Sequence, residues 1–193
     1  TVNCNTNASR PEAVARLATV GLTSLRVSLN SARPDHYARY YRPTNYSLED
    51  VRQAIRTGRS LGLWVSLNLL YFPGITDTEA ELEALARLVG EDGVSMIQWR
   101  NLNIDPEWHF RQMHAATAAL APDPTQPPAD VPAEGLDPEP GMGLTRFMKR
   151  LKKVCPWLRY GYFNPYLGTQ AEVSAPLPGQ WEFPTPEIDA TEE

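Results

Sequence analysis

The chain alternates between strand-like and helix-like segments through its first 121 residues. Short runs such as TVNCNTN, SLRVSLN and LWVSLNLLYF are each followed by a stretch whose apolar residues recur with helical spacing. The connections between these segments are short. Alternation of this kind predicts a parallel sheet with right-handed crossovers, so the sheet is either doubly wound or part of a barrel.

Capping residues indicate where the helices begin. A side chain that accepts a hydrogen bond from the first helical turn is typical of an N-cap, and proline suits the first helical position. We also expect a helix over 144–154 and a last strand over 158–165. The expected starts are Ser9 with Pro11 and Glu12, Ser47, Thr76 with Glu79, and Asp105 with Pro106.

The segment SLRVSLN places polar and apolar residues on opposite sides of one expected strand. A strand covered by helices on both faces should be apolar on both. We therefore expect the polar side to face a cavity and not a core. The polar set is Ser24, Arg26, Ser28 and Asn30, and the apolar set is Leu25, Val27 and Leu29.

Polar residues also collect where the expected strands end. In parallel α/β folds ligands bind at the carboxyl ends of the strands. Four strands with polar ends at equivalent heights predict a mouth that binds a polar ligand. These residues are Asn5, Thr6 and Asn7, then Ser28, Asn30 and Ser31, then Asn68, and then Gln98, Arg100, Asn101 and Asn103.

Composition and motifs exclude several other classes. The net charge of −5 disfavours a nucleic-acid-binding surface, and no apolar run approaches the roughly 18 residues of a membrane span. Neither a phosphate-binding glycine loop nor a metal-ligand spacing is present, and we interpret the three histidines as structural or exposed. The basic residues within 146–153 occupy the outer face of a helix, and Trp99 and Trp108 are expected to be packing residues.

Proline and acidic residues concentrate in two places and suggest how the chain is divided. We expect a partial barrel over 1–121, a proline-rich linker or loop over 122–141, a C-terminal helix and strand over 142–166, and a flexible tail over 167–193.

Four stretches together resemble the later part of a radical S-adenosylmethionine (radical SAM) enzyme core. They are the Asn-Thr-Asn turn at 5–7, LRVSLNSARPDHYARYYRP, VSLNLLYFPGITDTEAELEAL and MIQWRNLNIDP, which together cover about residues 1–105. The resemblance implies a partial (β/α)6, TIM-like barrel. It also implies a [4Fe–4S] cluster that cleaves S-adenosylmethionine reductively to start radical chemistry on a substrate that the sequence does not identify.

The family's C-x3-C-x2-C cluster loop is absent from this chain. Counting from Cys4, the other two ligand positions hold Ala8 and Pro11, and the second cysteine is Cys155. We therefore expect the first two barrel strands and the cluster loop to precede Thr1. This chain alone is then an inactive fragment with an unpaired sheet edge, and its C-terminal helix and strand extend the barrel.

The resemblance implies a role for each matching position. Cofactor contacts are implied for Asn5, Thr6 and Asn7 at the methionine moiety, Arg26 and Ser28 at the carboxylate and ribose, Asn68 at the ribose, and Pro73, Gly74 and Ile75 at the adenine. Adenine or substrate contacts are implied for Asn30, Arg100, Asn101 and Asn103. The family has glycine where this chain has Ala8, directly after the turn.

Two alternatives remain open from the sequence. The chain could be a degenerate, cluster-free barrel that acts as a ligand-binding or scaffold domain. It could also be a lyase or isomerase that uses Arg26 and Arg100 on a small carboxylate. In each case we expect a cytoplasmic protein whose partner is a small molecule, with no membrane contact.

Overall fold

The computed structural model describes residues 1–114, 140–161 and 175–184. The strands are β1 (Asn3–Thr6), β2 (Ser24–Leu29), β3 (Trp64–Tyr71), β4 (Met96–Asn101) and β5 (Arg159–Tyr160). The helices are α1 (Pro11–Thr19), α2 (Pro34–Tyr41), α3 (Leu48–Ser60), α4 (Glu79–Asp92), α5 (Pro106–His114) and α6 (Leu144–Val154).

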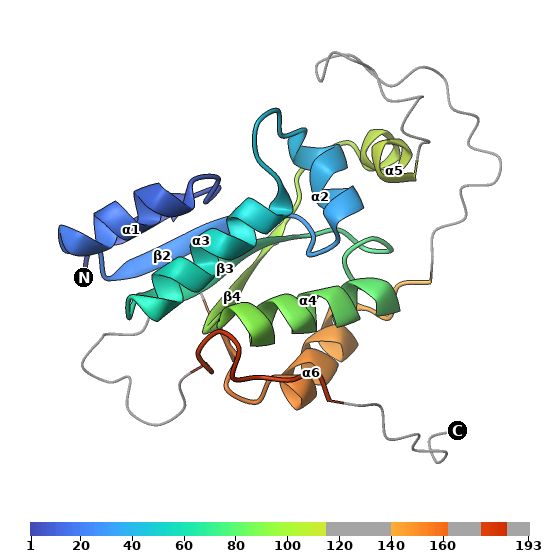
Figure 1. Cartoon of the computed structure of the whole chain (residues 1–193). Coiled ribbons are helices and arrows are strands. Elements are labelled where there is room, and N and C mark those ends of the chain that lie inside the picture. The colour runs from blue at the N-terminus through green and yellow to red at the C-terminus, as the bar shows by residue number, and fades with distance from the viewer. Residues whose placement is uncertain (115–139, 162–174, 185–193) are drawn as a thin grey trace.

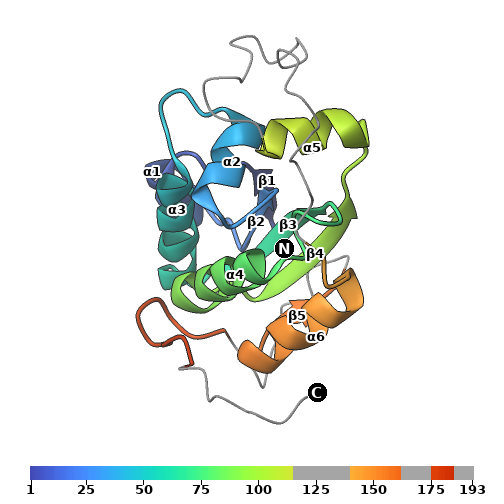
Figure 2. The ribbon, with the colours of Figure 1, turned by 90° about the vertical axis from the view of Figure 1, so that its right-hand side faces the viewer.

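The five strands form one parallel sheet in the order β1-β2-β3-β4-β5. Because each strand neighbours the next in sequence, helices that connect them by crossovers of one hand collect on one face of the sheet. Helices α1, α3 and α4 lie side by side along that face (Figures 1 and 2). Within the described residues the sheet remains open, with β1 and β5 at its two edges. The expected parallel α/β sheet of a partial TIM-like barrel is confirmed.

The apolar half of β2 faces the helices. Leu25, Val27 and Leu29 are fully buried there, together with Val51 and Ile55 of α3. Each such side chain stabilises the fold by about 2 kcal/mol relative to an exposed position. The apolar residues that alternate along β2 thus face the helices, and the polar residues between them lie on the opposite face of the sheet.

Two of the expected helix starts are confirmed. At α3 a capping box joins Ser47 and Asp50: the Ser47 backbone N–H donates to Asp50 Oδ2 at 2.7 Å, and the Ser47 side chain accepts from the Asp50 N–H. The Ser47 hydroxyl also donates to Asp50 Oδ2, at 2.9 Å. At α5 the backbone N–H of Trp108 donates to Asp105 Oδ1 at 2.7 Å. Both helices begin where a short polar side chain satisfies a free N–H of the first turn.

The start expected for α1 is wrong by one residue. Arg10 is the N-cap, and its carbonyl accepts hydrogen bonds from the N–H groups of the first turn. Pro11 takes the first helical position, where a missing N–H is tolerated. Ser9 lies outside the helix, and its N–H donates to the Asn7 side chain at 3.2 Å.

The cap expected for α4 is also displaced. The Thr76 hydroxyl is occupied by the backbone of Phe72, donating to its carbonyl at 3.0 Å and accepting from its N–H at 2.8 Å. Thr78, two residues later, is the N-cap and accepts from the N–H of Glu81 at 3.3 Å. Because a local turn uses the Thr76 hydroxyl, the threonine that the sequence pattern favoured does not cap the helix.

Helix α6 and strand β5 continue the sheet. Residues Arg159 and Tyr160 pair in register with Met96 and Ile97 of β4. Phe147 and Leu151 of α6 are fully buried in the same apolar core as the strands. The basic side of α6 is its outer face, as expected. Residues 162–165 of the expected last strand lie outside the described residues.

Residues 175–184, from the stretch expected to be a flexible tail, pack against α4. The ring of Trp181 lies over Gly90, where an added Cβ would be 2.2 Å from the nearest ring atom. The Arg87 guanidinium lies 4.3 Å from the centre of the Phe183 ring. Aromatic contact with a helix that carries glycine at the crossing holds this segment in place.

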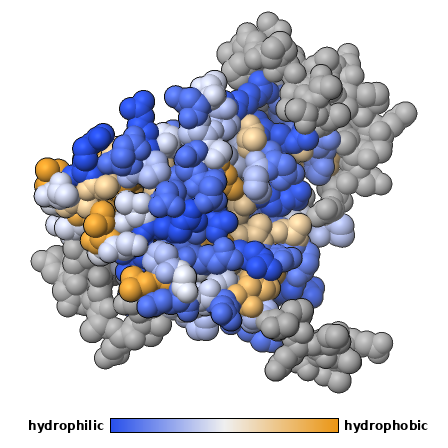
Figure 3. Space-filling view, viewed as in Figure 1, coloured by the Kyte–Doolittle hydropathy of each residue, from blue (hydrophilic) through white to orange (hydrophobic). Residues whose placement is uncertain are grey.

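The face that Figure 3 displays is hydrophilic over most of α3 and α4, with apolar patches toward α1. None of the described helices has the length and apolar content needed to cross a membrane. The exposed large apolar side chains are Val2, Leu17, Val20, Leu61 and Leu177.

Candidate functional site

The side of the sheet opposite the helices is called here the polar face. In a parallel sheet, residues paired in register point to the same side, so the register defines its members. They are Asn3 and Asn5, Ser24, Arg26 and Ser28, Trp64, Ser66, Asn68 and Leu70, Met96, Gln98 and Arg100, and Arg159. In a TIM-like barrel this is the side that faces the interior.

Burial along the polar face changes from one end of the strands to the other. Ser24 and Ser66, toward the amino ends, are fully buried. Ser28 and Asn68, which are neighbours in register nearer the carboxyl ends, are half-buried, and Arg100 is exposed. The polar face is therefore accessible at the carboxyl ends of its strands, where ligands bind in parallel α/β folds.

Two arginines approach each other on this face. The Nε of Arg100 donates to Asn68 Oδ1 at 3.3 Å, which turns the guanidinium of β4 toward β3. Burial lowers the pKa of Arg26, and the positive charge of Arg100 lowers it further. The two guanidinium groups thus lie within electrostatic range across the intervening strand β3.

Gln98 is the polar residue of this face whose burial is hardest to explain by the fold. It is 1% exposed, and among the described residues neither its Oε1 nor its Nε2 has a hydrogen-bond partner. A buried amide without partners costs about 1–3 kcal/mol. Gln98 lies beside the half-buried Asn68 in register, but its own amide is closed off from solvent.

The structure separates the three residues of the Asn-Thr-Asn turn. Asn5 lies on the polar face, beside Arg26 in register. Thr6 belongs to the other side, where it lines a small cavity of about 150 Å³ with residues of α1, and its hydroxyl accepts from the Ala8 N–H at 3.0 Å. Asn7 is exposed beyond the strand. Only Asn5 joins the arginines and Asn68.

Ala8 adopts a backbone conformation that favours glycine. Its φ of 54° is in the left-handed region, and the residue is buried at 3% exposure. The radical SAM family, which this chain resembles, has glycine at this position. The turn therefore keeps the conformation that glycine allows, although the side chain there is alanine.

The loop after β3 contains three of the expected adenine contacts. Asp77 organises it, because Gly74 N donates to Asp77 Oδ1 at 2.6 Å and the Tyr71 hydroxyl donates to Oδ2 at 3.1 Å. Gly74 has a φ of 77° and lines a small polar cavity of about 180 Å³. Ile75 is buried at 1%, whereas Pro73 is exposed.

The other expected contacts are distributed unequally. Asn30 is buried, and its Nδ2 donates to the His36 carbonyl at 3.1 Å, so one side of its amide serves the loop after β2. Asn101 pairs with Tyr71 on the helix side of the sheet, and Asn103 follows β4 in an exposed position. Of these substrate candidates only Arg100 lies on the polar face.

The sequence interpretation missed Glu81, which anchors the loop after β2. Its carboxyl group is fully buried in α4 and accepts from the Ser31 hydroxyl at 2.5 Å and from the Ala32 N–H at 2.6 Å. Burial raises the pKa of Glu81 to about 7, although these hydrogen bonds oppose the shift. The available signal was the Thr78-x-x-Glu81 spacing, which marks a helix start but not a contact 50 residues away.

The raised pKa of Glu81 makes stability depend on pH. The folded protein holds this proton up to about pH 7, whereas an unfolded glutamate loses it near pH 4.5, so the stability contributed by the proton is lost as pH rises through 7. Relative to Glu81→Gln, we expect wild type to lose about 2 kcal/mol of unfolding free energy between pH 5 and pH 8. Urea unfolding at both pH values measures this. Glu83→Gln, an exposed change on the same helix, is the control, and an unchanged pH response in Glu81→Gln would contradict the prediction.

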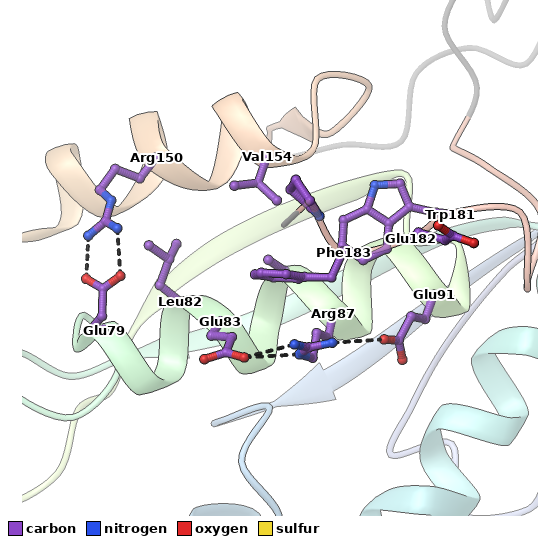
Figure 4. A pocket seen from close by; sticks show the side chains of 12 residues that line it. Glu79, Leu82, Glu83, Arg87, Glu91, Arg150, Val154, Trp181, Glu182 and Phe183 are labelled. Carbon is purple, nitrogen blue, oxygen red and sulfur yellow. Dashed lines mark hydrogen bonds and ion pairs between the residues drawn. The ribbon is translucent and has the colours of Figure 1, made fainter. Parts of the chain in front are cut away.

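A larger groove of about 910 Å³ lies elsewhere, between α4, α6 and residues 181–184 (Figure 4). Its charged groups largely pair with one another. Arg150 Nη2 donates to Glu79 Oε1 at 2.6 Å, and Arg87 Nη2 donates to Glu83 Oε1 at 3.0 Å. This groove is lined by the outer helices and contains none of the sequence-predicted site residues, so we place the candidate site on the polar face.

The described residues do not offer a cluster or metal site. No three His, Cys, Asp or Glu side chains within them are close enough to hold a metal ion. Cys4 lies beside α1 in the small cavity on the helix side, whereas Cys155 is fully buried in the core. With two cysteines in the chain, a three-thiolate site does not fit.

Two histidines, His36 and His109, are buried. Burial lowers the pKa of both His36 and His109 to about 4, so both are neutral at pH 7. His109 packs edge-on against Tyr40 and Phe72, which joins α5 to α2 and to the loop after β3.

A family model and a solved structure are each similar to part of this chain or of its fold. A sequence model described as the radical SAM superfamily matches residues 1–89. The crystal structure of a radical SAM methyltransferase from Sphaerobacter thermophilus is 19% identical, with a TM-score of 0.47, and the match covers 90% of this chain and 43% of that chain. No curated protein matches. The resemblance expected from the sequence is thus confirmed for residues 1–89, which match the radical SAM superfamily model.

Proposed function

We propose that this chain is part of a radical SAM enzyme and that its polar face binds S-adenosylmethionine. The observation that carries the proposal is the group of hydrogen-bonding side chains that meet at the carboxyl ends of β2, β3 and β4, away from the helices. Arg26, Ser28 and Asn68 in this group lie within the part of the chain that matches the family.

The side chains suit a zwitterionic, hydroxylated cofactor. The Arg26 guanidinium can hold a carboxylate through two parallel hydrogen bonds. Ser28 and Asn68, neighbours in register, can bind vicinal ribose hydroxyls, and Asn5 next to Arg26 can bind the methionine end. Pro73 is the exposed apolar residue available to the adenine. With an electron from a cluster in a longer protein, S-adenosylmethionine bound here would supply the radical chemistry, so no acid–base pair would be required on this face.

The cluster does not fit this chain, and we assign it no step here. The proposal for reductive cleavage therefore concerns a longer protein of which this chain would form a part. What the chain itself would do is bind the cofactor and orient its carboxylate and ribose. The substrate is not part of this proposal.

The cysteine placement favours a second candidate, a cluster-free barrel that binds a ligand or acts as a scaffold. Cys4 and Cys155 lie in separate parts of the structure, neither on the polar face. Under this alternative the polar face still binds a small polar molecule, but it does not prefer S-adenosylmethionine to other ligands.

Calorimetric titration of the chain with S-adenosylmethionine tests the proposal. We expect wild type to bind and Arg26→Gln to bind at least about tenfold more weakly, because the variant loses a charge-assisted pair of hydrogen bonds to the cofactor carboxylate. Arg16→Gln, which removes an exposed arginine of α1, should leave the dissociation constant unchanged. Absence of binding by wild type, or equal weakening in both variants, would overturn the proposed function.

A further inference from the structure

A small polar cavity lies apart from the residues that define the polar face. It is the cavity of about 180 Å³ that Gly74 lines, and the start of α2 and the end of α5 also contribute to it, through Arg33, Asp35, His36 and His114. One water molecule needs roughly 10–15 Å³, and a pocket for a whole cofactor has roughly 300 Å³ or more. The cavity therefore suits a small ion or the end group of a larger molecule.

Arg33 brings a positive charge to this cavity with part of its hydrogen-bonding capacity unused. Within the described residues its guanidinium makes one hydrogen bond, from Nη2 to Asp35 Oδ2 at 3.1 Å. The side chain of Arg33 is 27% exposed, so it is partly accessible and not locked in the core. A guanidinium has five N–H donors, and Nε and Nη1 therefore remain available to a ligand.

His36 is a second, independent indication of a ligand. Its side chain is only 7% exposed, and its Nδ1 is closed off from solvent without a hydrogen-bond partner. Its Nε2 is 3.9 Å from Asp35 Oδ2, beyond hydrogen-bond distance. A buried imidazole normally pairs at least one ring nitrogen. Since His36 lines the cavity, a ligand there can accept a hydrogen bond from Nε2.

The charges around His36 favour an anion. Burial is the main reason that the pKa of His36 falls to about 4, and the charge of Arg33 lowers this pKa further. Asp35 raises the pKa, whereas His114 and Arg39 lower it. Even without the histidines, two arginines act on this position against one carboxylate. The cavity therefore attracts an anion more than a cation.

We propose that this cavity binds a small oxyanion, either a carboxylate or a phosphate. Arg33 supplies the charge and a hydrogen bond from its unpaired nitrogens, and His36 donates a second hydrogen bond from Nε2. Asp35, which shares Arg33 with the ligand, weakens the binding. The site uses no residue of the polar face and needs no S-adenosylmethionine, so it goes beyond the proposed function.

The test is calorimetric titration of the whole chain with inorganic phosphate and, separately, with acetate, at constant chloride concentration. We expect at least one probe to bind and Arg33→Gln to weaken its binding about tenfold or more. The probe that binds identifies the oxyanion. Asp35→Asn should act in the opposite direction and tighten binding at least about threefold, because Arg33 loses its competing carboxylate. Arg16→Gln, the loss of an exposed arginine on α1, should have no effect.

The site is wrong if neither probe binds, if Arg33→Gln and Arg16→Gln act alike, or if Asp35→Asn weakens binding. Circular dichroism checks that each variant folds, and Arg33→Lys, which keeps the charge, should bind more tightly than Arg33→Gln.

The same variants separate this inference from the proposed function. Arg33→Gln should change the dissociation constant of S-adenosylmethionine less than about twofold. If it weakens S-adenosylmethionine as strongly as Arg26→Gln does, Arg33 belongs to the cofactor site and the separate oxyanion site is wrong. Arg33-dependent probe binding without any binding of S-adenosylmethionine would support the oxyanion site and overturn the proposed function.

Discussion

Replacing Phe147 by alanine should lower the free energy of unfolding by about 4 kcal/mol, the largest effect that we expect from one substitution. The side chain is fully buried, and its ring meets Trp99 of β4 edge-on, with centroids 5.8 Å apart at 88°. Alanine removes the ring, and the surrounding strands and helices cannot close the cavity fully. Urea unfolding followed by circular dichroism and by tryptophan fluorescence measures the loss.

The same variant tests whether α6 and β5 belong to the folding unit of the sheet. Because Phe147 lies in the core shared with β2, β3 and β4, both probes should show one transition at one midpoint. Lys149→Ala, an exposed change on the same helix, should lie within about 0.5 kcal/mol of wild type. Separate transitions, with the sheet unaffected by the loss of Phe147, would show that 142–166 folds independently. Phe147→Leu provides a milder variant if alanine prevents folding.

The second large effect is expected for Asp92→Ala, at about 3 kcal/mol. Asp92 ends α4, its side chain is completely buried, and it joins two arginines of α3. Arg52 donates to it through Nε at 2.7 Å, and Arg56 donates through Nη1 at 2.9 Å. Burial raises the pKa of Asp92, and the two arginines oppose the rise. Without the carboxylate, both guanidinium groups lose their shared partner at the α3–α4 contact.

Chemical unfolding of three variants measures this contribution. Glu83→Ala removes an exposed ion pair with Arg87 one turn away and should cost no more than about 0.5 kcal/mol. Arg56→Gln should cost less than Asp92→Ala, because Arg52 still neutralises the carboxylate. If Asp92→Ala and Glu83→Ala prove equally stable, the buried network does not hold α3 to α4.

Much of the fold could be read from local patterns. Each expected strand and helix within the described residues formed, since hydrophobic period and capping side chains act over a few residues. The errors were also local. Thr76 was a better cap by spacing than Thr78, but a turn with Phe72 had already used its hydroxyl. Spacing shows which side chains can cap, and competing hydrogen bonds decide which one does.

The candidate site shows the limit of sequence reasoning more clearly. A cluster of consecutive polar residues, such as 5–7, was expected to act together, yet the pleat of the strand sends Asn5 and Thr6 to opposite sides. Glu81 was missed because its partners lie 49 and 50 residues away, in a loop that no local pattern connects to α4.

The sequence by itself determined the parallel α/β class, the order of the elements and the division of β2 into an apolar and a polar side. These properties depend on the side chains of near neighbours and on the two backbone periods, 2 for strands and 3.6 for helices. The tertiary structure decided which of the expected polar residues share one face. Arg26, Asn68, Gln98 and Arg100 lie on it, whereas Thr6 and Asn101 lie on the helix side. Strand register places these side chains beside one another. Register depends on how whole segments pack, and a short stretch of sequence does not contain that information.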